Sequence, residues 1–214
     1  NRDVFGILIE GLKRLEYRGY DSAGLSLIDA NSCLNTQKTI GRVADLEDLF
    51  NGEIPNGGLG IAHTRWATHG VPSSANSHPH TSGSISVVHN GIIENHNLLK
   101  EELRDRGATL SSETDSEVIA HLIELYSSET GSLKEAVDKT LSRLEGAYAI
   151  CAISKDYPDK MIGARSGSPL VIGLGIGEHF MASDQMALRQ VTDRFIYLEA
   201  VSYTHLRAHE TSLH

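Results

Sequence analysis

The segment HTRWATHG at residues 63–70 gathers a cation, an aromatic ring, two histidines and two hydroxyls directly after an apolar run. The guanidinium of Arg65 presents a planar fork of N–H donors that matches the two oxygens of a carboxylate. Thr68 and His69 follow where the chain leaves the run, so both can turn toward the same point. The segment therefore predicts a carboxylate-binding site. The alternative, which Arg65 alone favours, is a surface arginine paired with a nearby acid.

A second segment, VVHNGIIEN at residues 87–95, places Asn90 and Gly91 directly after a strand-like run. The side-chain amide of Asn90 and the unobstructed backbone N–H of Gly91 are two donors that can point at one oxygen. We therefore expect an oxyanion hole, a pair of donors that stabilises negative charge developing on a carbonyl oxygen. The alternative is a hairpin turn, for which Asn-Gly is the commonest signal. The residues that follow, IIEN, lack the alternating polarity usual in a strand after such a turn.

The other polar candidates carry weaker signals. Asp115 stands at the start of a predicted helix, where its carboxylate either meets an ammonium group or complements the helix dipole. The spacing of His78 and His80 suits a metal, but no cysteine or carboxylate is in register, so packing within the loop is favoured. His205 and His209 lie one helical turn apart and lack a third ligand in register. We expect neither a metal nor a cofactor.

Glycine and cysteine residues give no further site. The run GLGIGE at 173–178 is followed by strand-like residues rather than a helix, which favours a hairpin turn over a nucleotide site. Cys33 and Cys151 lie far apart, which is neither a disulfide framework nor a metal spacing. Cys151, inside AYAICAIS, is interpreted as a small buried hydrophobe.

The elements that position these groups alternate in type along the chain. Helical spacing of apolar residues predicts a helix over 4–16, and alternation predicts a strand over 22–29. Strand-like runs at 59–67 and 84–93 flank a loop at 67–83. The pattern then predicts helices and strands, in this order: helices within 95–107, 112–126 and 132–146, and strands at 147–154, 161–164, 169–174, 179–183 and 194–199. Short consecutive strands joined by tight turns indicate antiparallel pairing in a layered α+β fold.

Composition excludes some classes of partner. The chain has 214 residues, a length that suits one large domain, and a formal net charge of −9. Its basic residues are scattered, so neither nucleic acid nor an anionic membrane is an expected partner. No apolar run reaches the roughly 18–20 residues that span a bilayer, and no charged-then-apolar leader opens the sequence. We expect a cytoplasmic location.

Several segments, in the same order along the chain, resemble one family. They are LEYRGYDSAG at 15–24, HTRWATHG at 63–70, HPH at 78–80, HNGIIENH at 89–96, SETDSEVIAHL at 112–122, GAYA at 146–149, ARSGSPLVIGLG at 164–175 and SDQ at 183–185. The resemblance is to the glutaminase domain of glutamine–fructose-6-phosphate aminotransferases, and it extends from the first residues to about Leu198. It implies an N-terminal-nucleophile hydrolase fold, a four-layer sandwich of two antiparallel sheets between helical layers, which releases ammonia from glutamine.

The resemblance also implies a role for each residue that binds the substrate, L-glutamine. Arg65, helped by Thr68 and His69, holds the α-carboxylate of glutamine, and Asp115 takes its α-ammonium. Trp66 is similar to the tryptophan that screens the site and gates the passage of ammonia. In the whole protein the ammonia passes to an isomerase domain that binds the sugar phosphate, and the whole protein is expected to be a homodimer.

The catalytic roles follow from the same resemblance. Asn90 and Gly91 stabilise the tetrahedral oxyanion, and Arg18 lines the site near the nucleophile. The family's nucleophile is a cysteine at the mature N-terminus, whose α-amino group acts as general base. The sequence NRDVFG, with which this chain starts, resembles the family a few residues downstream of that cysteine. We therefore expect the glutamine pocket to be mostly present, the first step of turnover to be absent, and the first strand to be missing from its sheet.

The far end also departs from the family's pattern, because VSYTHLRAHETSLH follows RFIYLEA. We assign residues 1–200 to the glutaminase domain and expect 201–214 to be an atypical tail outside the fold. Three functional hypotheses remain. The first is the glutaminase half of an enzyme that makes glucosamine 6-phosphate, the second is a non-catalytic glutamine-binding module, and the third is the glutaminase domain of another amidotransferase of this class.

Overall fold

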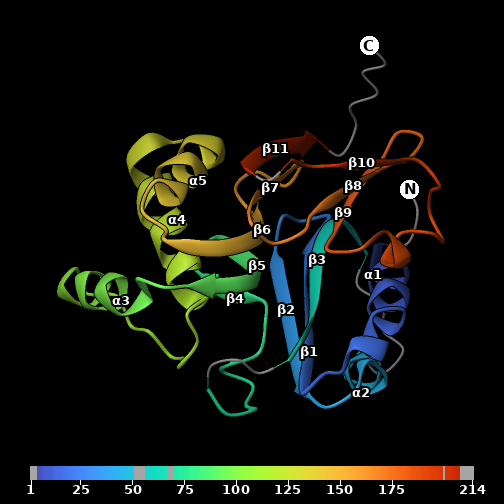
Figure 1. The fold of residues 1–214 in the computed structure, drawn as a ribbon, viewed down its shortest axis with the longest axis horizontal. Helices are drawn as coiled ribbons and strands as arrows, with labels where there is room; N and C mark the ends of the chain where they lie inside the picture. The colour runs from blue at the N-terminus through green and yellow to red at the C-terminus, as the bar shows by residue number, and fades with distance from the viewer. Residues whose placement is uncertain (1–3, 51–55, 67–69, 200, 208–214) are drawn as a thin grey trace.

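The computed structural model describes residues 4–50, 56–66, 70–199 and 201–207. Figure 1 shows antiparallel sheets at the centre of the molecule, with helices α1 and α2 on one side and α3, α4 and α5 on the other. The predicted layered α+β fold is confirmed. In the described ranges no helix is both long and apolar enough to cross a membrane.

The helices match the predicted ones with one addition. Their bounds are α1 Val4–Lys13, α2 Val43–Asp48, α3 His96–Asp105, α4 Glu117–Thr130 and α5 Leu133–Leu141, with short 3₁₀ turns η1 Glu16–Arg18 and η2 Gln185–Ala187. Ser132 caps the N-terminus of α5, because its side chain accepts a hydrogen bond from the Glu135 N–H. Asn95 precedes α3 without capping it, since its side chain bonds instead to the Arg143 carbonyl and the Glu145 N–H.

The strands form three antiparallel sheets. The first has the order β2-β1-β3, from β1 Ser22–Asp29, β2 Leu34–Ile40 and β3 Gly57–Arg65. The second has the order β11-β7-β6-β5-β4, from β4 His80–Ser82, β5 Ile85–Ile93, β6 Gly146–Ser154, β7 Lys160–Ser166 and β11 Val201–Arg207. The third has the order β10-β8-β9, from β8 Val171–Leu174, β9 His179–Ala182 and β10 Phe195–Tyr197. The predicted hairpin at the Gly-rich run joins β8 to β9.

Three hydrophobic clusters mark three interfaces between layers. One joins α1 and α2 to one face of β1, and the largest joins α3, α4 and α5 to the sheet that contains β5, β6 and β7. The third lies between the two sheets and contains Ile28 and Ile61 from one sheet and Cys151 and Ile153 from the other. Successive side chains of a strand point to opposite faces, so β1 and β6 each serve two interfaces. This arrangement is the four-layer sandwich that the resemblance implies, and the small sheet β10-β8-β9 is additional to the two sheets that were predicted.

The C-terminal part differs from expectation. The backbone of β11, Val201–Arg207, pairs with β7 along its whole length, whereas residues 201–214 were expected to lie outside the fold. Residues 208–214, which include His209 of the predicted histidine pair, lie outside the described residues. Strand β11 therefore provides an edge of the second sheet, opposite the edge formed by β4.

Candidate functional site

A polar cavity of about 160 Å³ opens where β3, β5 and the loop before α4 meet. It is several times larger than the roughly 30 Å³ occupied by one water molecule in the liquid, so a small solute fits. Its lining residues are His63, Arg65, Trp66, His78, His89, Asn90, Gly91, Thr114, Asp115 and Ser116. Five predicted site residues, Arg65, Trp66, Asn90, Gly91 and Asp115, therefore share one cavity. Thr68 and His69 lie outside the described residues.

Arg65 is the last residue of β3 and is only 5% exposed. Its Nη1 lies 3.5 Å from a carboxylate oxygen of Asp21, and its Nη2 donates to the carbonyl of Gly70 at 3.0 Å. The strand partner Ser22 on β1 follows Asp21 directly, which explains why the acid and the guanidinium meet. Arg65 thus has an acidic partner, as in the alternative of a surface arginine paired with a nearby acid. The Arg65 side chain, however, is buried and lines a cavity rather than lying exposed on the surface.

Trp66 lies at the mouth of the cavity with 66% of its surface exposed. Its ring rests against Gly19, where even a single added carbon would overlap the indole. Gly19 also has a φ of 90°, a conformation that favours glycine. The sequence offered one signal for this contact, the glycine after Arg18, but no pattern linked that glycine to a tryptophan that lies 47 positions further along the chain.

Asn90 and Gly91 lie inside β5, opposite Ala149 and Tyr148 of β6. The hairpin-turn alternative is therefore wrong, and so is the expectation that the pair comes directly after the strand, which continues to Ile93. Gly91 has a φ of 133°, and a side chain there would overlap the Ala147 carbonyl oxygen. Only glycine fits this close approach between two backbones.

Asp115 is 3% exposed and faces the cavity from the loop before α4. One carboxylate oxygen accepts a hydrogen bond from the Ile93 N–H at 2.8 Å, and the other accepts one from the Ser116 hydroxyl at 3.3 Å. Its hydrogen bonds therefore tie the loop to the end of β5. Among the described residues no N–H of α4 donates a hydrogen bond to this carboxylate, whose alternative role was to complement the dipole of that helix.

The loop that carries Asp115 is organised by the buried carboxylate of Glu117. This carboxylate accepts hydrogen bonds from the backbone N–H and the hydroxyl of both Ser111 and Ser112. Burial by itself would raise the pKa of Glu117, but hydrogen bonds from His121 and the two serines outweigh it and hold that pKa well below its usual range. Glu117 is therefore ionised at neutral pH and fixes the path of the loop.

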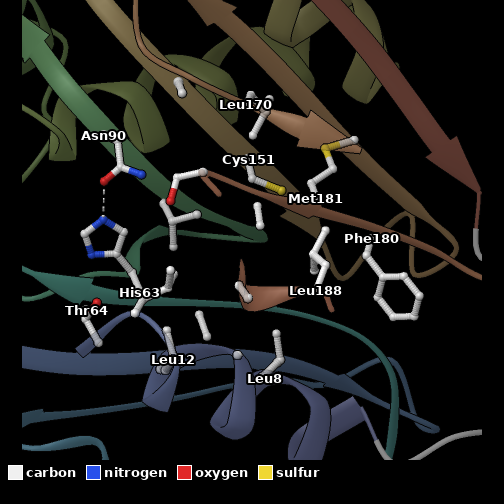
Figure 2. Close-up of a pocket in the computed structure, with 18 of the residues that line it drawn as sticks. Leu8, Leu12, His63, Thr64, Asn90, Cys151, Leu170, Phe180, Met181 and Leu188 are labelled. Carbon is white, nitrogen blue, oxygen red and sulfur yellow. Dashed lines mark hydrogen bonds between the residues drawn. The ribbon is translucent and has the colours of Figure 1, made fainter. Parts of the chain in front are cut away.

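Arg18 lies beside a second cavity rather than in the first. Its guanidinium pairs with the Asp184 carboxylate and lies 3.5 Å from the Ser183 hydroxyl. The second cavity, of about 170 Å³, is mainly apolar and lies between α1, β3, β6 and β9 (Figure 2). It shares His63, His89 and Asn90 with the polar cavity, so the two adjoin along these residues.

Neither cysteine lies in the polar cavity. Cys151 points from β6 into the apolar cavity, and burial raises the pKa of its thiol to about 12, which keeps it protonated (Figure 2). Cys33 is exposed in the turn that precedes β2, where the Asp29 carboxylate accepts a hydrogen bond from its N–H. The interpretation of Cys151 as a buried hydrophobe is confirmed.

Four histidines, His63, His78, His80 and His89, form a cluster in which His63 is partly buried and the other three are buried, and all but His80 line the polar cavity. Burial lowers the pKa of all four, to about 3 for His80 and about 4 for His89. The rings of His63 and His78 stack at 4.3 Å, and those of His78 and His80 meet edge to face at 4.7 Å. Within the described ranges no group of three potential ligands is arranged to hold a metal.

His63 and His89 were not predicted to be site residues, although they lie in the segments HTRWATHG and HNGIIENH. Each is a polar residue inside an otherwise apolar strand run, GIAHT and SVVHN, and that pattern is the available signal. His89 bonds through Nδ1 to the Ser116 hydroxyl at 2.8 Å, next to Asp115. His63 bonds through Nε2 to the Asn90 carboxamide oxygen at 3.0 Å.

Comparison with known proteins places this geometry in a family. The family described as "Glutamine amidotransferase domain" matches residues 63–190. The chain is 54% identical over 213 residues to glutamine–fructose-6-phosphate aminotransferase [isomerizing] of Vibrio vulnificus, a match that covers 100% of this chain and 35% of the relative. The Shigella flexneri enzyme of the same name is 57% identical over 198 residues, covering 92% of this chain and 32% of the relative. The chain thus spans about a third of the length of these relatives.

Two solved structures share the fold. Glutamine phosphoribosylpyrophosphate amidotransferase from B. subtilis aligns with a TM-score of 0.75 at 28% identity, covering 99% of this chain and 48% of that one. A second structure, described as the allosteric regulatory enzyme of purine biosynthesis, aligns with a TM-score of 0.76 at 27% identity, covering 96% and 47%. The sandwich is therefore of the N-terminal-nucleophile amidotransferase type, and the chain belongs to the glutamine amidotransferase domain family.

Proposed function

We propose that this chain is the glutaminase half of an enzyme that makes D-glucosamine 6-phosphate and L-glutamate from D-fructose 6-phosphate and L-glutamine. The single observation that carries the proposal is the convergence of Arg65, Asp115, Asn90 and Gly91 on one small cavity. A buried cation and a buried anion that line one cavity suit the α-carboxylate and α-ammonium of a free amino acid. The choice of acceptor rests on the relatives, which carry that enzyme's name at 54% identity.

In this proposal each end of glutamine has its own partner. The Arg65 guanidinium binds the α-carboxylate, with Thr68 and His69 as additional donors, and the Asp115 carboxylate binds the α-ammonium. The Trp66 ring, held against Gly19 at the cavity mouth, covers the bound amino acid. Positioning both charged ends leaves the side-chain amide pointing along the cavity toward Asn90, where the polar and apolar cavities adjoin.

The chemical step then takes place beside Asn90. A thiolate attacks the carboxamide carbon, and the carbonyl oxygen becomes an oxyanion that the Asn90 amide and the Gly91 N–H stabilise. As the intermediate collapses, the C–N bond breaks, and the proton that the α-amino group took from the thiol passes to the departing nitrogen, which leaves as ammonia. Water then hydrolyses the remaining thioester to glutamate and the free thiol. Cys151 and Cys33 do not fit the nucleophile's role, since one is a protonated thiol in a strand and the other is exposed in a distant turn. We assign the role to an N-terminal cysteine upstream of residue 1, with Arg18 lining the site beside it.

A second candidate is a glutamine-binding module without catalysis. It is favoured by the positions of the two cysteines in this chain, neither of which lines the polar cavity. The glutaminase domain of another amidotransferase of this class is the third candidate, and the B. subtilis structural neighbour belongs to such an enzyme at 28% identity. The higher identity to the aminotransferases favours the first assignment.

The remaining proposals concern the whole protein. The relatives are almost three times as long as this chain, since it covers 35% of their length. We propose that the additional length forms the isomerase domain that binds the sugar phosphate and receives the ammonia. We also propose that the whole protein is a homodimer, as the resemblance implies, and that it is cytoplasmic, as expected from the sequence.

The test is glutamate release by the chain extended upstream with the Cys-Gly segment of its relatives. We expect steady release of glutamate and ammonia from glutamine, and none from the same protein with that cysteine changed to alanine. The alanine protein should still bind glutamine, which separates the chemical step from substrate recognition. If the extended protein folds and binds glutamine without releasing glutamate, the binding-module candidate replaces the glutaminase.

A further inference from the structure

His63 contacts the predicted oxyanion hole without having a part in the proposed function. It lies on β3, two residues before Arg65, and reaches across to Asn90 on β5. The two atoms joined are His63 Nε2 and Asn90 Oδ1, 3.0 Å apart. Figure 2 shows the carboxamide oxygen of Asn90 turned toward the His63 ring, while the carboxamide nitrogen points away from the ring on the side of the apolar cavity, which adjoins the polar one.

The orientation of this carboxamide decides what it can do. A carboxamide has one acceptor oxygen and one donor nitrogen on opposite branches, so fixing one branch fixes the other. With the oxygen held by His63, the NH₂ group faces the cavity and can donate to an oxyanion. With the amide turned over, an oxygen would face the cavity and repel the same negative charge. An oxyanion hole built on Asn90 therefore needs a donor on the far side of its carboxamide.

His63 is suited to be that donor. Burial lowers the pKa of its imidazole, so the ring is neutral at pH 7 and has one N–H. Its Nδ1 is buried and makes no hydrogen bond of good geometry, although the His89 backbone also interacts with the ring. A proton on Nδ1 would be a buried donor without a well-placed acceptor, whereas a proton on Nε2 meets Asn90 Oδ1. The surroundings thus favour the Nε2–H tautomer.

The ring is also held in place. It stacks on the His78 ring at 4.3 Å with an interplanar angle of 33°, and His78 packs edge to face against His80. His80 is tied to the Thr114 hydroxyl at 3.1 Å, one residue before Asp115. A rotation of the His63 ring would have to displace this stack. The cluster therefore links the orientation of the Asn90 amide to the loop that carries Asp115.

We propose that His63 is a positioning residue of the glutaminase reaction, whose Nε2–H donates to Asn90 Oδ1 and so turns the Asn90 N–H groups toward the oxyanion. The inference rests on the proposed function for its role, but the hydrogen bond itself belongs to the chain alone. Two experiments separate these two parts.

The first experiment determines the tautomer of His63 in this chain at pH 7 by long-range ¹⁵N–¹H correlation spectra, with a His63→Gln sample to assign its signals. We expect one protonated nitrogen, Nε2. A proton on Nδ1 would mean that Asn90 donates to His63 and presents its oxygen to the cavity, which overturns the proposal. This result does not depend on any activity.

The second experiment measures glutamate release by the full-length protein with two matched variants. A glutamine side chain at position 63 places an amide N–H near the position of Nε2, whereas an asparagine side chain ends near Nδ1. We expect His63→Asn to lower kcat by about 10- to 100-fold with KM changed less than threefold, as for partial loss of an oxyanion donor. His63→Gln should retain at least tenfold more kcat than His63→Asn.

Equal losses in the two variants, or losses confined to KM, would overturn the positioning role. Urea unfolding of both variants shows whether they fold equally well. If the unaltered full-length protein releases no glutamate, the proposed function fails, while the tautomer measurement still decides whether His63 holds the Asn90 amide.

Discussion

At the scale of single residues, the central feature is a buried guanidinium and a buried carboxylate that face one cavity. Arg65 and Asp115 are 5% and 3% exposed, so both charges interact in an environment where water screens them little. Each is held by neighbours, Arg65 by Asp21 and the Gly70 carbonyl, and Asp115 by the Ile93 N–H. Their positions are therefore set before any ligand arrives, which lowers the entropy cost of binding a zwitterion.

We predict that Arg65→Ala weakens glutamine binding by about 2–4 kcal/mol, because it leaves the ligand's carboxylate partly buried without a partner. Trp66 is the single tryptophan of the chain and lines the same cavity, so its fluorescence reports the titration. Arg104→Ala, at an exposed position on α3, is the matched control and should leave binding unchanged. Equal affinity of the Arg65 variant and the unaltered chain would mean that the carboxylate binds elsewhere.

Asn90→Ala tests the oxyanion hole in the protein that carries the N-terminal cysteine. Removing one donor from such a site lowers kcat by roughly 10²–10³ and leaves KM nearly unchanged, because the interaction forms mainly in the transition state. Steady-state rates of glutamate release give both constants. A change in KM alone would show that Asn90 contacts glutamine in the ground state instead.

At the scale of elements, β5 carries much of the site. It supplies Asn90 and Gly91 to the cavity, and its end holds Asp115 through the Ile93 N–H. The close approach of β5 to β6 at Gly91, with a φ of 133°, means that this part of the strand departs from regular β geometry. The departure falls at the proposed oxyanion donor, where backbone strain is often found in enzymes.

Gly91→Ala should destabilise the protein by about 1–3 kcal/mol or more, because the added methyl group overlaps the Ala147 carbonyl oxygen and the φ suits glycine. Urea unfolding measures the change. Gly58→Ala on β3 is the matched control, since no atom lies within 4 Å of the added carbon, and it should change stability by less than about 0.5 kcal/mol. Similar losses in both variants would contradict the close approach.

The elements were predictable where their apolar pattern was strong. Strand β1 has the predicted bounds, 22–29, because its apolar residues alternate, and the helix predicted over 4–16 is α1. Strand β2 and helix α2 were not predicted, since β2 is mostly polar with only partial burial and α2 has six residues. Short or polar elements depend on neighbours from distant parts of the chain, which a local pattern does not contain.

The residues of the candidate site were predictable in part. Arg65, Asn90, Gly91 and Asp115 were found from residue chemistry and family resemblance, and the structure brings them to one cavity. The contact of Trp66 with Gly19 was not found, because nothing local couples two segments that meet only in the fold. The strand-like run predicted over 84–93 already contained Asn90 and Gly91, and β5 confirms it. Only the site argument put the pair after the strand, since Asn-Gly is the usual signature of a hairpin.

At the scale of the whole molecule, the buried histidines link stability to pH. The pKa of His89 is lowered to about 4 and that of His80 to about 3, against an ordinary value of 6.5. The unfolded chain therefore binds these protons at a higher pH than the folded protein does. The resulting stability is fully present above pH 6.5 and is lost as the pH falls toward the folded-state values.

The free energy of unfolding should thus fall by about 1.4 kcal/mol per pH unit for each of these histidines below pH 6.5. Urea unfolding at pH 7.5, 6.0 and 5.0 measures the slope in a range where carboxylates with lowered pKa values stay ionised. His80→Gln should reduce this slope by about 1.4 kcal/mol per pH unit, the contribution of one histidine. A stability that does not change between pH 7.5 and 5.0 would show that the histidines are not buried in the neutral form.

The polar cavity lies between β3 of the first sheet, β5 of the second sheet and the loop before α4, and the central claim is that this cavity binds glutamine by its two charged ends. Titration calorimetry of the chain with L-glutamine, beside 4-aminobutanamide, which lacks the α-carboxylate, tests that claim most directly. We predict saturable binding of glutamine at one site and at least tenfold weaker binding of the analogue. A folded chain that binds neither compound, or both equally, would contradict it.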